Sequence, residues 1–126
     1  MKNNKLTIVI DRPIEDVFEY TINPKNTHLW IDAIPEEVAS EYPPKINTEY
    51  KHREGSVWIK FKVIEFERNK VFTLTDSNKN YTVRYTYKKI NENKTELEYV
   101  EWMNKGKLET PLTKETLEKL KKIMES

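Results

Sequence analysis

The chain has 126 residues, a length typical of one domain, with 37% hydrophobic and 34% charged residues. Its 22 basic and 21 acidic side chains give a net charge of +1, and the two signs are interleaved, which disfavours nucleic-acid binding. Cysteine is absent, which excludes disulfides, thiolate metal sites and a cysteine nucleophile. Gly55 and Gly106 are the only glycines, which excludes glycine-rich phosphate loops and a nucleophile elbow.

The first predicted elements are a strand over residues 5–11 and a helix that begins at Pro13. Proline suits the first helical position because its missing N–H needs no partner there. The apolar face of this helix is formed by Ile14, Val17, Phe18 and Ile22. Asn23 and Pro24 predict a second short helix, with Asn23 as its N-cap, that ends at Trp30. A tightly turned helix pair is therefore expected directly after the first strand.

The middle of the chain is predicted to consist of strands. Residues 37–41 are expected to form a short edge strand, and alternating apolar and polar residues follow from residue 47 onward. The predicted strands cover residues 48–53, 58–67, 71–76, 81–90 and 95–103. Because short polar turns join them at even spacing, they predict an antiparallel meander. A final helix is predicted from Lys114, with Thr113 as its N-cap.

The order of these elements resembles a known group of proteins. A strand, a helix pair, six strands and a closing helix, together with the run I-D-R-P-I-E-D-V-F-E-Y from Ile10 and the later Trp30, resemble the START-related (SRPBCC) superfamily. This superfamily includes polyketide cyclase-like and Bet v 1-like proteins. The resemblance implies an α+β helix-grip fold, in which a curved seven-stranded antiparallel sheet wraps around the C-terminal helix. It also implies that residues 1–126 form one START-like domain that holds an apolar small molecule between sheet and helix.

The closing helix is short for this architecture. About 12 residues from Lys114 reach about 18 Å at 1.5 Å per residue, whereas the predicted strand at 58–67 reaches about 33 Å. The sequence therefore predicts a pocket that is small or open at one end.

Strand alternation assigns side chains to the concave face. It places several phenols and one carboxylate there, and Trp30 is expected to plug one end of the sheet. The predicted ligand-binding residues are Trp30, Tyr50, His52, Phe61, Tyr85, Tyr87, Tyr99 and Glu101. The alternative is that these tyrosines simply suit strands and that Trp30 only fills the core. A β-bulge in the last strand would turn Glu101 outward.

The inferred function is binding of a small hydrophobic or aromatic molecule. The alternatives are a polyketide cyclase or dehydratase type of enzyme and a protein-interaction module. The residues favour binding over catalysis, because nothing forces His52 and Glu101 together as an acid–base pair and no catalytic residue is shared across the superfamily. No cofactor is implied, and no metal site is predicted since His28 and His52 lie on different elements. The N-terminal apolar run is too short for a signal peptide, so a cytoplasmic protein without a membrane span is expected.

Overall fold

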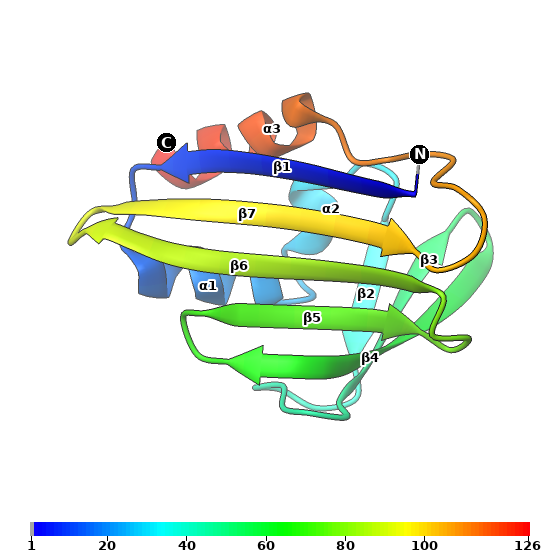
Figure 1. The fold of residues 1–126 in the computed structure, drawn as a ribbon. Coiled ribbons are helices and arrows are strands. Elements are labelled where there is room, and N and C mark those ends of the chain that lie inside the picture. Colours follow the sequence, from blue (N-terminus) through cyan, green and yellow to red (C-terminus); the bar gives the residue numbers. More distant parts are fainter. Residues whose placement is uncertain (1) are drawn as a thin grey trace.

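A computed structural model describes residues 2–126 of the chain. Seven strands and three helices make up the fold (Figure 1). In chain order they are β1 (Asn3–Ile10), α1 (Ile14–Ile22), α2 (Thr27–Trp30), β2 (Glu36–Ala39), β3 (Glu49–Glu54), β4 (Val57–Glu67), β5 (Val71–Asp76), β6 (Tyr81–Asn91), β7 (Lys94–Met103) and α3 (Lys114–Glu125). Each strand expected from alternation and turn chemistry is present. Within residues 2–126 no helix is long and apolar enough to cross a membrane.

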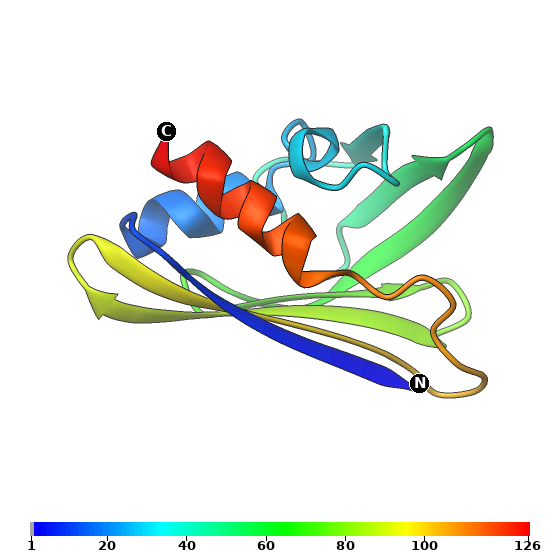
Figure 2. The same ribbon diagram turned by 90° about the horizontal axis from the view of Figure 1, so that it is seen from above.

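All seven strands belong to one antiparallel sheet in the order β1-β7-β6-β5-β4-β3-β2. The three helices lie on the same, concave side of this sheet (Figure 2). This arrangement confirms the predicted α+β helix-grip fold. The order follows from the chain, because short turns pair the meander strands in sequence and β1 then adds beside β7.

One irregularity in β4 shapes the concave side. The pairing of β4 with β5 shifts between Val63 and Glu65, and a bulge of this kind bends a strand and increases its twist. After the bulge Phe66 replaces Glu65 on the core side, where its ring lies 5.6 Å from that of Phe18. The β3–β4 hairpin turns toward the helices (Figure 2), so it forms a side wall of the concave space.

The start of the second helix differs from the prediction. Asn23 is the C-cap of α1 rather than an N-cap, and α2 begins only at Thr27. The Asn23 side chain accepts a hydrogen bond from the backbone N–H of Lys25 at 3.0 Å. Asparagine forms this local turn readily, so residues 24–26 become a turn between the helices rather than the first turn of α2.

Helix α3 begins as predicted and lies beside the free edge of β1. The Thr113 hydroxyl accepts a hydrogen bond from the backbone N–H of Thr116, which caps the helix. Its buried residues are Leu117, Leu120 and Met124. On its outer side, Lys114 donates to the carbonyl oxygen of Thr7, and Lys121 donates to that of Val9 at 2.8 Å. Lysine ammonium groups thus occupy backbone acceptors along the edge of β1.

Candidate functional site

Two adjoining cavities lie on the concave side of the sheet, away from α3, and Thr21 near the end of α1 lines one of them. The inner compartment, with a volume of about 70 Å³, lies among the sheet, α2 and β2. The outer compartment, of about 460 Å³, is bounded on one side by the loop between β7 and α3. The compartments share the lining residues Ile31, Ile34, His52, Tyr81 and Tyr99. They therefore form one pocket with a narrow inner part and a wide outer part.

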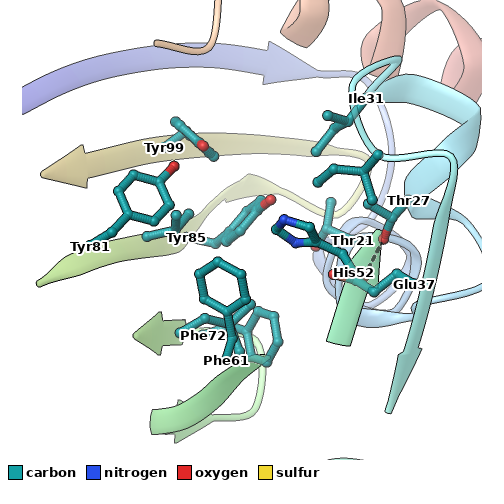
Figure 3. A pocket seen from close by; sticks show the side chains of 13 residues that line it. Thr21, Thr27, Ile31, Glu37, His52, Phe61, Phe72, Tyr81, Tyr85 and Tyr99 are labelled. Carbon is teal, nitrogen blue, oxygen red and sulfur yellow. Dashed lines mark hydrogen bonds between the residues drawn. The ribbon is translucent and has the colours of Figure 1, made fainter. Parts of the chain in front are cut away.

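Aromatic side chains wall the inner compartment (Figure 3). The rings of Tyr85 and Tyr99 lie 5.3 Å apart at 89°, and Phe72 lies 6.1 Å from Tyr85. On the other side, the Phe61 ring lies 6.1 Å from that of Tyr81. The Tyr85–Tyr99 and Phe61–Tyr81 contacts are edge-to-face and the Phe72–Tyr85 contact is tilted. Such ring pairs stabilise one another beyond the area they bury, so the wall is a packed aromatic cluster.

The wall phenols keep their protons across the neutral range. Burial raises the pKa of both Tyr85 and Tyr99 well above 10. The hydroxyl group of Tyr85 points toward the imidazole ring of His52 (Figure 3). These phenols can consequently donate hydrogen bonds in a largely aromatic and apolar compartment.

Glu101 is a nearly fully buried carboxylate, 2% exposed, beside the outer compartment. Its Oε1 accepts a hydrogen bond from the Tyr81 hydroxyl at 2.6 Å. Its Oε2 accepts from Asn4 Nδ2 at 2.9 Å and from the backbone N–H of Leu112 at 2.7 Å. The carboxylate therefore joins β1, β6 and the segment before α3. No bulge turns β7 at this position, since Glu101 keeps its regular register opposite Val83.

Tyr81 belongs to this site although it was not among the predicted ligand-binding residues. It lines both compartments. Burial and the adjacent Glu101 raise its pKa above 10. Alternation could have indicated it, because Tyr81 lies on the same face of β6 as Tyr85, diagonally across from Glu101 on β7.

Glu37 is a second acidic group in the pocket and was also missed. It lies opposite His52 in the pairing of β2 with β3 and lines the inner compartment. The hydroxyl of Thr27 donates a hydrogen bond of 2.6 Å to its carboxyl group. Burial raises the pKa of Glu37 from 4.5 to about 7, although the Thr27 hydrogen bond acts in the opposite direction. Its protonation state therefore changes near neutral pH.

His52 separates the two compartments and lines both. Its Nε2 lies 2.7 Å from an oxygen of Glu54. Its ring lies 4.8 Å from that of Phe61 at an interplanar angle of 33°. The ring is thus fixed by a carboxylate on one side and by an aromatic contact on the other.

The predicted site residues separate into two groups. The structure brings His52, Phe61, Tyr85, Tyr99 and Glu101 together around the pocket. The three others, Trp30, Tyr50 and Tyr87, do not line either compartment.

The side chains outside the pocket are held in the core by specific contacts. The Tyr50 hydroxyl donates to the carbonyl oxygen of Ile22 at 2.7 Å. The Tyr87 and Thr21 hydroxyls form a hydrogen bond of 2.6 Å. Trp30 is 1% exposed, and its ring meets that of Tyr85 edge-on at 6.4 Å. These three residues consequently pack α1 and α2 onto the sheet.

The pocket lies elsewhere than expected relative to the closing helix. The sequence analysis placed it between the sheet and the C-terminal helix, but no residue of α3 lines either compartment. Helix α3 has only 12 residues and buries Leu117, Leu120 and Met124 in the core. The remaining concave surface is therefore covered by α2, β2 and the loop before α3, and the pocket lies beneath them.

This fold, with a pocket on the concave face of its sheet, is that of the START-related, polyketide cyclase-like proteins. The chain belongs to the polyketide cyclase / dehydrase and lipid transport family, whose model matches residues 1–125. No curated protein sequence matches it.

Several solved structures share this fold. A conserved protein of unknown function from Enterococcus faecalis superposes with a TM-score of 0.76 at 13% identity, covering 97% of this chain and 70% of that chain. An uncharacterised protein from Bacillus thuringiensis superposes with a TM-score of 0.72 at 13% identity, covering 98% of this chain and 99% of that chain. A polyketide cyclase-like protein from Corynebacterium glutamicum superposes with a TM-score of 0.62 at 19% identity, covering 81% of this chain and 65% of that chain. At these identities the similarity establishes the fold alone.

Proposed function

We propose that the protein binds a small hydrophobic or aromatic molecule in the two-compartment pocket. The observation that carries this proposal is the aromatic wall of the inner compartment, which opens onto a volume of about 460 Å³. Ligand pockets are typically about 300–1,000 Å³ and are mostly apolar with a few polar groups that fix orientation. Tyr85, Glu37 and Glu101 are polar groups of that kind in this pocket.

The neutral fluorescent probe N-phenyl-1-naphthylamine tests this function. We expect saturable binding with enhanced emission, because the aromatic wall shields the probe from water. Ile34 lies where the compartments meet, so Ile34→Trp should block the junction and weaken binding by about tenfold or more, the effect of a loss of about 1.4 kcal/mol.

The matched control is Ile90→Trp, at a 47% exposed position on β6 that does not line the pocket. It should bind the probe like the unchanged protein. Equal binding by the Ile34→Trp variant would place the probe elsewhere. If no probe binds at all, a protein-interaction role for the fold becomes the better proposal.

A second candidate function is acid–base catalysis of the cyclase or dehydratase type. It is favoured by the position of Glu37, a carboxyl group in the lining of the inner compartment whose pKa burial raises to about 7. A general base works best with a pKa near the working pH. Conversion of a linear poly-β-ketone, lost in Glu37→Gln, would support catalysis. Binding of that compound without conversion would support the first proposal.

A further inference from the structure

The pocket has an acidic balance. Glu37, Glu54, Glu101 and Glu109 line it, whereas its basic residues are His52 and Lys107. Glu54 is paired with His52. Among residues 2–126, neither Glu37 nor Glu101 takes part in a salt bridge, and the hydrogen bonds they accept come from a hydroxyl, a phenol, an amide and a backbone N–H. Within the described residues these two carboxyl groups therefore have no cation of the protein within salt-bridge distance.

The aromatic wall is suited to a cation. Ammonium groups are attracted to the faces of aromatic rings, and recognition of quaternary ammonium ligands by several rings is a common use of this attraction. The inner compartment is lined by Phe61, Phe72, Tyr81, Tyr85 and Tyr99, and Glu37 lies on the opposite side of it, beside Thr27 and His52 (Figure 3). Its volume of about 70 Å³ has room for a compact group rather than a whole ligand.

The hydroxyl group of Tyr85 gives an independent indication that the compartment receives a ligand. Tyr85 is 7% exposed and lines the inner compartment. Its hydroxyl group makes no hydrogen bond to any other residue in the 2–126 range. It is not among the buried polar atoms that lack a partner, so it is open to the compartment and available to a ligand atom or to water.

We propose that the ligand carries a compact cationic group, an ammonium or quaternary ammonium, that occupies the inner compartment between the aromatic rings and the carboxyl group of Glu37. The apolar remainder of the ligand lies in the outer compartment, against Met103, Leu108 and Leu112. This inference rests on the proposed binding function and specifies the chemical class of the ligand.

Binding of a permanent cation should depend on pH. Glu37 is neutral below its pKa of about 7. Below that pH the carboxyl group must lose its proton before it can pair with the cation. The affinity for the cation therefore falls by up to about tenfold for each unit by which the pH is lowered. The groups that face Glu37 are Thr27 from α2, Tyr50 and His52 from β3, and Tyr85 from β6. His52 would also repel a cation when protonated, so its contribution has to be separated from that of Glu37.

The test compares two molecules of almost the same shape, phenyltrimethylammonium and neutral tert-butylbenzene, by NMR titration at a pH of about 8, above the pKa of Glu37. We expect the cation to bind at least about tenfold more tightly. Glu37→Gln should remove most of this preference, and Glu36→Gln should retain it, because Glu36 is exposed on the same strand and paired with Arg53. His52→Gln should retain the decline in affinity toward low pH.

The outcomes separate this inference from the proposed function. Equal or tighter binding of tert-butylbenzene would overturn the cationic ligand while leaving hydrophobic binding intact. Binding of the naphthylamine probe with no binding of either small molecule would overturn it as well. A pH dependence that disappears in His52→Gln but persists in Glu37→Gln would also contradict it. Failure of all three probes would remove the binding function itself.

Discussion

Replacing Glu101 with leucine is expected to lower the free energy of unfolding by about 3 kcal/mol. The carboxylate accepts hydrogen bonds from Tyr81, Asn4 and the backbone N–H of Leu112. Leucine would leave the Tyr81 hydroxyl and the Leu112 N–H without an acceptor, while Asn4 Nδ2 would keep only its hydrogen bond to the carbonyl oxygen of Leu112. Each buried unsatisfied group costs about 1–3 kcal/mol. Water in the outer compartment can reach part of this cluster, which keeps the expected loss below the sum.

Denaturant unfolding measures this effect, with Glu98→Leu as the control. Glu98 lies on the same strand, but its side chain is 34% exposed and its partner is the exposed Lys5, 3.4 Å away. An exposed pair of this kind contributes about 0–1 kcal/mol. Similar losses for the two variants would show that the Glu101 cluster does not hold β1, β6 and the segment before α3 together.

Glu37 is expected to make the protein less stable as the pH rises from about 4.5 to about 7. Because burial raises the pKa of this group, the folded chain retains a proton in that range that the unfolded chain has released. Its contribution to stability is therefore complete below pH 4.5 and is lost as the pH passes about 7. The slope is about 1.4 kcal/mol per pH unit, or about 3–4 kcal/mol over the whole interval.

The difference in stability between the unchanged protein and Glu37→Gln isolates this contribution from other carboxylates, such as Glu125, whose pKa the backbone N–H of Asp11 lowers. Glutamine cannot ionise, so the variant should become relatively more stable toward high pH. Glu36→Gln, at an exposed position of the same strand, should show no such trend. A pH-independent difference for Glu37→Gln would mean that the Glu37 carboxyl group titrates in its ordinary range.

The topology was predictable because it depends on local signals. Alternation in the long strands and polar turns between them specify the pairing, and Thr113 specifies the start of α3. The bulge after Val63 was not predictable, since it depends on whether Glu65 or Phe66 packs better on the core side of the sheet. The Phe18 ring that receives Phe66 belongs to α1, far away in the sequence.

The site was predictable only where the strand pattern alone determines it. Alternation put Tyr85, Tyr99 and Glu101 on the concave face. Alternation could not show that the Tyr87 hydroxyl forms a hydrogen bond with Thr21 of α1. This contact holds the Tyr87 side chain outside the pocket. Glu37 lies in a strand of four residues, too short for a clear period, and its surroundings depend on how α2 packs over β2.

Lys114 and Lys121 of α3 affect whether a strand of another protein molecule can pair with the edge of β1. An unpaired edge strand normally offers its backbone as a template on which another strand can add. Along β1 the acceptors at Thr7 and Val9 are already occupied by the ammonium groups of Lys114 and Lys121. An incoming strand would have to displace both charges and strip them of their partners. The closing helix thus protects the β1 edge against the addition of another strand, and acetylation of these two lysines would remove the charges from that edge.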